Sequence, residues 1–141
     1  MNEKISVLNK DLDQSDMKGA IAGFSEKISK SFSIIKDCTF THEYFDIQKI
    51  IVLGMGGSAI GGDVARVIVQ NECTVPIIVN RSYNIPEWVD SHTLVIASSY
   101  SGGTEETLSA FAQCREKNSP IIVLSSGGKI SKHADEYGLE K

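Results

Sequence analysis

The sequence predicts an α/β fold: a three-layer, doubly wound parallel sheet preceded by an amphipathic N-terminal helix. Short apolar runs rich in β-branched residues recur along the chain, and segments with helical spacing lie between them. Strands that alternate with helices through short turns are typical of doubly wound sheets with right-handed crossovers. The runs are apolar throughout rather than alternating, which predicts strands that are covered on both faces.

The N-terminal segment is predicted to be helical. Apolar residues recur there every three or four positions, as on one face of an amphipathic helix, at Met17, Ile21, Phe24, Ile28, Phe32 and Ile35. We therefore expect residues 1–40 to form a helical segment and residues 41–141 to form the α/β domain. The helix is expected to pack across a core or against a partner.

The rest of the chain contains four apolar runs that we expect to be strands, at 49–55, 75–82, 93–100 and 120–126. Helical spacing predicts one helix between the first two runs and another between the last two, from Ile60, Val64, Val67 and Ile68 and from Leu108, Phe111 and Ala112. The link "YNIPEWVD" is irregular because Pro86 limits any helix. After the fourth run, "GGKISKHADEYGLEK" begins a further helix.

Composition narrows the class of protein. A length of 141 residues suffices for one domain with its own core, and a spread net charge of −4 argues against a nucleic-acid partner. No apolar run approaches the roughly 18 residues of a membrane span, so we predict a cytoplasmic protein without a membrane partner. The three cysteines, Cys38, Cys73 and Cys114, are scattered, as are the histidines. We expect reduced thiols in or near the core, no metal site and no cofactor.

Two loops have the composition of a ligand site. They are "GMGGSAIGG" after the first strand and "SSYSGGTEET" after the third, and ligands of open parallel sheets bind beyond the carboxyl ends of the strands. Gly56 and Gly57 expose main-chain N–H groups in the first loop. Ser58 then opens the helix, where its hydroxyl either caps the backbone or binds an anion. For this loop alone the two interpretations weigh about equally.

The second loop favours an anion. Ser99, Ser101 and Thr104 place three hydroxyls around two glycines, whereas helix capping needs one hydroxyl. We therefore predict a cup that binds the phosphate of a phosphorylated sugar, formed by Gly56, Gly57, Ser58, Ser99, Ser101 and Thr104. The following acids, Glu105 and Glu106, suit the positive end of a helix dipole. For Ser125 and Ser126, in "SSGGKI" after the fourth strand, a simple turn is favoured over a place in the pocket.

Two other phosphate-binding motifs fit the sequence less well. Gly54, Gly56 and Ala59 match the dinucleotide pattern G-x-G-x-x-G/A, which is weak when it stands alone. The acid expected about 20 residues later is missing, because Asn80 and Arg81 stand there, and these fit only the phosphorylated cofactor. An NADP-dependent oxidoreductase is therefore a minor alternative. The Walker pattern fails, since no GK[ST] follows a glycine loop.

The segments "GMGGSA", "RSYNIP", "TLVIASSYSGGTEETL" and "PIIVLSSGGKI", in this order, resemble the bifunctional phosphoglucose/phosphomannose isomerases of the sugar isomerase (SIS) superfamily. The resemblance runs from about Lys49 to about His133. It implies that residues such as Gly57, Ser58, Ser99, Ser101 and Thr104 hold a phosphorylated hexose. It also implies a homodimer formed through SIS helices, and an aldose–ketose isomerisation through an enediol that needs no metal. The family commonly has Asn where this chain has Gly103.

The resemblance also implies that the chain is the first half of a two-SIS enzyme. In that family the base glutamate, the ring-opening histidine, a lysine and a pocket arginine lie beyond the matched stretch. We therefore expect no catalytic residue in this chain and no turnover by it alone. The alternative is a non-catalytic SIS sensor of phosphosugars. The preference for glucose or mannose 6-phosphate stays open, and no chemical role is assigned to Arg81, Tyr83, Glu105 or Glu106.

Overall fold

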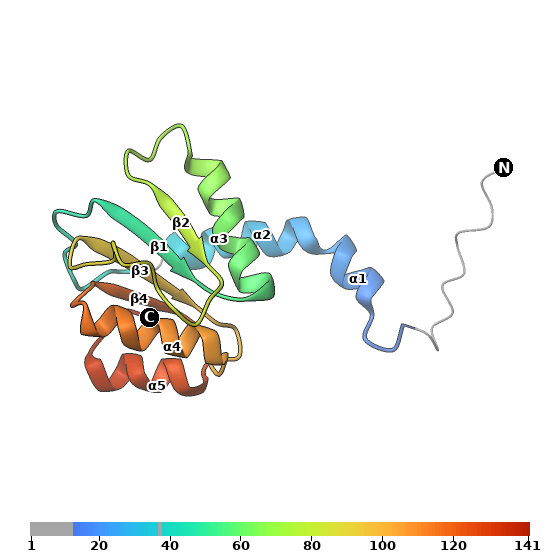
Figure 1. Ribbon diagram of the computed structural model, residues 1–141. Helices are drawn as coiled ribbons and strands as arrows, with labels where there is room; N and C mark the ends of the chain where they lie inside the picture. Colours follow the sequence, from blue (N-terminus) through green and yellow to red (C-terminus); the bar gives the residue numbers. More distant parts are fainter. Residues whose placement is uncertain (1–12, 37) are drawn as a thin grey trace. The chain divides into compact units, whose positions relative to one another are not determined.

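The computed structural model describes residues 13–36 and 38–141, which divide after Thr39 into two compact units. The first unit contains α1 (Met17–Ala22) and α2 (Phe24–Lys36). The second contains β1 (Lys49–Leu53), α3 (Gly56–Val69), β2 (Ile77–Asn80), β3 (Thr93–Ser98), α4 (Glu105–Glu116), β4 (Ile121–Leu124) and α5 (Gly128–Tyr137) (Figure 1).

The first unit is helical, as predicted, but the helix is interrupted. Gly23 ends α1 and donates its N–H to the carbonyl of Gly19 at 2.9 Å, and α2 starts at the next residue. Glycine is a poor helix former, which accounts for a break at this position. At the start of α1, the Asp16 carboxylate accepts a hydrogen bond of 3.2 Å from Gly19 N. The first part of the predicted segment, residues 1–12, lies outside the described residues.

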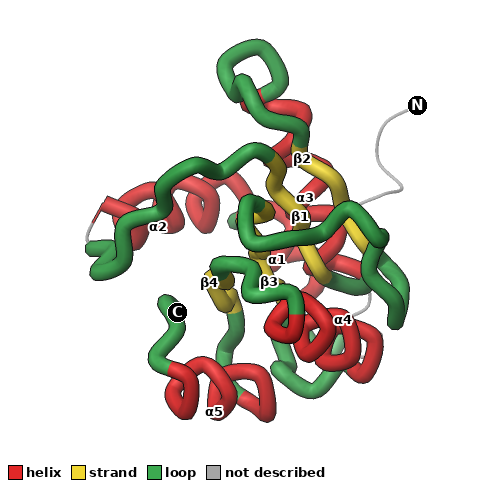
Figure 2. The backbone as a smooth tube through the Cα atoms, turned by 60° about the vertical axis from the view of Figure 1, so that its left-hand side comes forward, coloured by secondary structure: helices red, strands yellow, loops and turns green. Residues whose placement is uncertain are grey.

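The second unit is built on a sheet of four parallel strands in the order β2-β1-β3-β4, which confirms the predicted fold class (Figure 2). From β1 the chain passes through α3 to β2 at one side of the sheet. From β3 it passes through α4 to β4 at the other side. The direction of winding therefore reverses between β1 and β3, which are neighbours with Leu53 opposite Ala97.

Helices cover both faces of this sheet, because successive side chains of a strand point to opposite faces. Ile51 and Leu53 belong to a core cluster with Phe111 of α4 and Ile130 of α5. Val52 points the other way, toward α3, where a Cβ built on Gly62 would come within 2.9 Å of the Val52 side chain. Thus α3 covers one face, and α4 and α5 cover the other (Figure 1).

Burial of the strands is less even than the apolar runs predicted. Along β3 the buried residues Thr93, Val95 and Ala97 alternate with half-buried ones, and Leu124 of β4 is 53% exposed. The prediction of complete cover on both faces is therefore wrong for β3 and β4, because α3 packs mainly over β1 and β2. It is also wrong for β2, which has no buried residue and whose Ile78 is 38% exposed.

The cysteine prediction holds for one thiol of the three. Cys114 is in the core, where burial raises the pKa of its thiol to about 12. Cys73 is half-buried and Cys38 is exposed, so the expectation of core thiols is wrong for Cys38.

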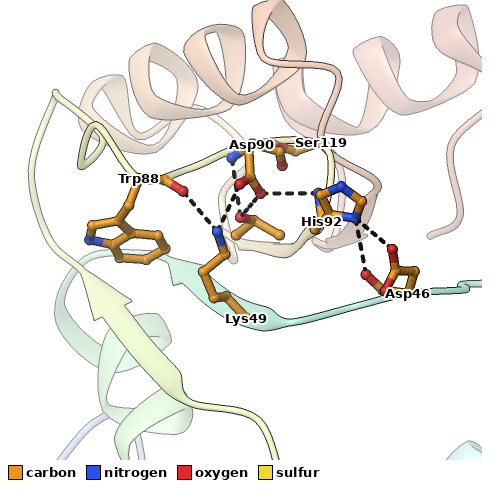
Figure 3. Close-up of polar contacts among 7 residues, drawn as sticks. Asp46, Lys49, Trp88, Asp90, His92 and Ser119 are labelled. Carbon is orange, nitrogen blue, oxygen red and sulfur yellow. Dashed lines mark hydrogen bonds and ion pairs between the residues drawn. The ribbon is translucent and has the colours of Figure 1, made fainter.

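The link between β2 and β3 contains no helix, as Pro86 predicted. Instead it lies against the α4 side of the sheet, with Val89 in the core and Ile85 packed against it. Its end carries a polar network at the amino ends of β1 and β3 (Figure 3). There Lys49 Nζ donates to Asp90 Oδ2 at 2.8 Å and to the Trp88 carbonyl at 3.1 Å.

His92 extends this network, since its Nδ1 lies 3.1 Å from Asp46 Oδ2. The Ser119 hydroxyl donates to the Asp90 carbonyl at 2.7 Å. These contacts link the first residue of β1 to the segments that directly precede β3 and β4. Within residues 13–36 and 38–141, no helix has the length and apolar character that crossing a bilayer requires.

Candidate functional site

The two glycine loops meet at the carboxyl edge of the sheet. They follow β1 and β3, whose ends are adjacent and lead to helices on opposite faces, and ligands of open α/β sheets bind at such a reversal. A pocket of about 510 Å³ lies there. It is lined by Met55, Gly57, Ser58, Tyr100, Ser101 and Thr104.

Four of the six predicted site residues line this pocket: Gly57, Ser58, Ser101 and Thr104. Ser99 is 2% exposed and lies behind them, with its Oγ 3.1 Å from Thr104 Oγ1. Gly56 is beside the pocket in sequence and is not among the lining residues. Sequence reasoning missed Met55 and Tyr100, although Tyr100 stands inside the quoted motif and its 82% exposure is unusual for an aromatic residue.

The hydroxyls in this pocket do not cap their helices. The N-cap of α3 is Met55 and that of α4 is Thr104, and neither makes a side-chain cap hydrogen bond. Among the described residues, Ser58 Oγ has no protein partner, so the capping interpretation of Ser58 is wrong. The N–H groups of Gly56 and Gly57 precede the first backbone hydrogen bond of α3, which runs from Ser58 N to the Met55 carbonyl at 3.1 Å. Those of Glu105 and Glu106 precede the bond of α4 from Leu108 N to the Thr104 carbonyl at 3.0 Å. Amide and hydroxyl donors of two helix N-termini are therefore available at one place.

The two glycines of the first loop have different tasks. Gly56 has a φ of 52°, in the left-handed region that favours glycine, and this turns the chain from β1 into α3. A Cβ built on Gly57 would find no atom within 4 Å, so this position faces open space at the pocket. Gly56 thus serves the turn and Gly57 leaves room.

The loop after β4 braces the loop after β3. Gly102 has a φ of 65°, and a Cβ built on it would lie 1.7 Å from the Gly127 carbonyl oxygen. A Cβ on Gly128 would lie 2.3 Å from the Ser101 carbonyl oxygen. Ile130 N also donates to the Gly102 carbonyl at 2.9 Å. Two backbones therefore touch at a distance that only glycine permits.

Two serines add hydrogen bonds to this contact between the loops after β3 and β4. Ser125 Oγ lies 2.7 Å from the Ser99 carbonyl oxygen, and Ser126 N donates to the Tyr100 carbonyl at 3.2 Å. The simple-turn prediction for "SSGGKI" is correct in that neither serine lines the pocket. Their supporting role was missed, because it depends on a contact between loops that are far apart in the sequence.

Backbone groups and helix dipoles supply the positive potential of the pocket, and the carboxylates of Glu105 and Glu106 stand in the first turn of α4, directly after Thr104. All six lining residues are uncharged. The N-termini of α3 and α4 together present the positive ends of two helices, which attract an anion. The arrangement can therefore hold a small anion through N–H and O–H donors without a side-chain cation.

Comparison with known proteins identifies an SIS domain in this chain. The SIS domain model matches residues 43–137. The bifunctional phosphoglucose/phosphomannose isomerase of Caldicellulosiruptor bescii is 46% identical over 121 residues, which cover 86% of this chain and 36% of that protein. Its counterpart in Thermoplasma acidophilum is 43% identical over 85 residues, which cover 60% of this chain and 26% of that protein.

A solved structure shares the fold. The crystal structure of a candidate phosphosugar isomerase from Clostridium difficile matches with a TM-score of 0.58 at 23% identity, over 77% of this chain and 31% of that one. This chain spans about a third of the length of the curated relative from C. bescii. The matched SIS region covers most of the second unit and more than half of the whole sequence, and the chain therefore belongs to the SIS domain family.

Proposed function

We propose that this chain is the N-terminal SIS half of an isomerase that interconverts glucose 6-phosphate and mannose 6-phosphate with fructose 6-phosphate. In this proposal the pocket at the carboxyl edge, with Ser99 behind it, is a phosphate cup for the substrate. The convergence of two uncapped helix N-termini and their hydroxyls carries the proposal. The names of the two relatives described above support the reaction.

The hydroxyls are arranged as donors. Ser101 Oγ accepts a hydrogen bond of 3.3 Å from Gly103 N, which leaves its own proton for a ligand. Ser99 is buried, and if its hydroxyl donates to Thr104 Oγ1 over 3.1 Å, the Thr104 proton points to the phosphate. Hydrogen bonds to a charged oxygen are shorter and stronger than neutral ones, so a phosphate gains more from this set than an uncharged sugar does.

The chemistry of the proposed reaction sets the role of this half. Moving a proton between C1 and C2 needs a positioned carboxylate base and a donor for the developing oxyanion. We propose that those groups come from the remaining part of a longer protein and that residues 13–141 bind and orient the phosphate end. Fixing that end lowers the entropic part of the barrier, since the reacting carbons are then presented in one geometry.

The test is a binding titration of the full chain with fructose 6-phosphate. The double substitution Ser101→Ala and Thr104→Ala should weaken binding by roughly 1–3 kcal/mol, because charge-assisted hydrogen bonds are lost. Ser91→Ala is the matched control, since Ser91 is exposed at the opposite edge of the sheet. An unchanged affinity for fructose 6-phosphate in the double variant would refute phosphate binding at these residues.

We also propose that the protein is a homodimer and that α3 forms part of its interface. Four apolar side chains of α3 share one helical surface and are 52–72% exposed: Ile60, Val64, Val67 and Ile68. Apolar residues at this spacing usually face a partner. A second copy of the chain would bury them.

A further inference from the structure

The loop that follows β2, residues 81–86, is fastened to two helices. At its start the Arg81 guanidinium pairs with the Asp63 carboxylate of α3. Further along, Gln113 of α4 donates from Nε2 to the Tyr83 carbonyl at 2.6 Å. The same carboxamide accepts from Ile85 N through Oε1 at 3.3 Å. One glutamine therefore satisfies both backbone groups around the middle of the loop.

Contacts within the loop complete its support. Asn80, the last residue of β2, donates from Nδ2 to the carbonyls of Ser82 and Asn84 at 3.2 and 3.3 Å. Asn84 N in turn donates to Ser82 Oγ at 3.3 Å. Five backbone groups of this short exposed loop are thus bonded to side chains: the carbonyls of Ser82, Tyr83 and Asn84 and the N–H groups of Asn84 and Ile85.

The side chain that this support presents is Tyr83. Tyr83 is 47% exposed, and its hydroxyl donates to Glu105 Oε2 at 3.4 Å. Glu105 is the first residue of α4 and follows directly after Thr104 of the cup. The neighbouring Glu106 carboxylate, partial burial and Glu105 raise the pKa of Tyr83, so its phenol keeps its proton at neutral pH. A phenol and a carboxylate are therefore paired beside Thr104, and we call this pair the rim of the cup; neither side chain is among those that line the pocket.

This pair suits the sugar and not the phosphate. A carboxylate repels a phosphate dianion, whereas it accepts hydrogen bonds from alcohols, and a phenol both donates and accepts. Consecutive Cα atoms are about 3.8 Å apart, so Glu105 lies within the reach of a six-carbon chain whose phosphate contacts Thr104. A sugar that extends from the cup toward α4 meets these two side chains.

We propose that Tyr83 and Glu105 bind hydroxyl groups of the sugar whose phosphate occupies the cup, and that Gln113 is the positioning residue that holds Tyr83 in place. This inference rests on the proposed function, because it requires the phosphate in the cup. It assigns the recognition of the sugar, as distinct from the phosphate, to the rim formed by these residues.

The experiment compares two probes on the full chain by calorimetric titration: inorganic phosphate, which tests the cup alone, and fructose 6-phosphate, which tests cup and rim. Tyr83→Phe and Glu105→Gln should each weaken fructose 6-phosphate binding roughly three- to tenfold, as expected for one lost hydrogen bond, and should not weaken phosphate binding. Glu116→Gln, at the far end of α4, is the matched control for charge.

Gln113→Ala should give the same selective loss as Tyr83→Phe. The ratio of the two affinities is the readout, because a general loss of stability would weaken both probes together. Two results in Tyr83→Phe and Glu105→Gln would overturn the rim. One is an equal loss of affinity for both probes, and the other is an unchanged affinity for fructose 6-phosphate. If the wild-type chain binds fructose 6-phosphate no more tightly than inorganic phosphate, the rim is overturned and the cup stands. A chain that binds neither probe overturns both.

Discussion

Replacing Gly102 by alanine should destabilise the second unit and disturb the proposed phosphate cup, although Gly102 itself does not line the pocket. The substitution adds one methyl group where the loops after β3 and β4 touch. That methyl would lie 1.7 Å from the Gly127 carbonyl oxygen, so the two loops must separate. Separation pulls on Ser101, the next residue, which lines the pocket.

The size of the effect follows from two contributions. Gly102 has a φ of 65°, and an alanine in the left-handed region costs about 1–2 kcal/mol. Moving the loops apart also breaks the 2.9 Å hydrogen bond from Ile130 N to the Gly102 carbonyl, worth about 1 kcal/mol. The sum is at least about 2–3 kcal/mol, which for a unit of this size lowers the melting temperature by roughly 8 °C or more.

The measurement is thermal unfolding followed by circular dichroism, with Gly103→Ala as the control. Gly103 is the neighbouring residue, its φ is not positive, and a Cβ built on it meets no atom within 4 Å. Its alanine variant should unfold within about 0.5 kcal/mol of the wild-type chain. Equal melting temperatures for the two variants would refute the brace between the loops.

Gly57→Ala should keep its melting temperature and lose phosphate affinity in a titration, because the added methyl enters the open space of the pocket; an equal affinity would contradict this. Thr107→Val should raise the free energy of unfolding in urea by up to about 1 kcal/mol, since Thr107 Oγ1 is buried without a partner among the described residues; a loss would reveal a missed hydrogen bond. The Thr41 hydroxyl, with His42, lowers the pKa of Glu140 to about 2 from its usual value of 4.5, so this carboxylate stabilises the fold above its unfolded pKa and the effect disappears as pH falls toward 2. Glu140→Gln should therefore flatten the acid limb of a stability–pH curve, and an unchanged limb would count against it. Val64→Lys should shift the proposed dimer to monomer in sedimentation velocity, and a persistent dimer would place the interface elsewhere.

Much of the fold could be predicted because its signals are local. The apolar runs and their spacing predict the strands and helices. The same spacing continues across Gly23, so it does not predict the break between α1 and α2. The uneven burial of β3 and β4 could not be predicted, because it depends on which strands α3 covers.

The candidate site shows the same division. Ser58, Ser101 and Thr104 were found because turns between strand and helix have a recognisable composition. The contacts of Gly102 with Gly127, and of Gln113 with Tyr83, join segments about 25 and 30 residues apart. No pattern within either segment indicates such a contact, so both required the structure.

The Lys49–Asp90 network described above lies at the end of the strands that is remote from the pocket. With five residues in β1 and a rise of roughly 3.3 Å per residue, the two regions are about 16 Å apart. Substitutions separated by more than about 10 Å usually have additive effects. Substitutions in the loops at the pocket should therefore leave the contribution of the Lys49–Asp90 network to the stability of the sheet unchanged.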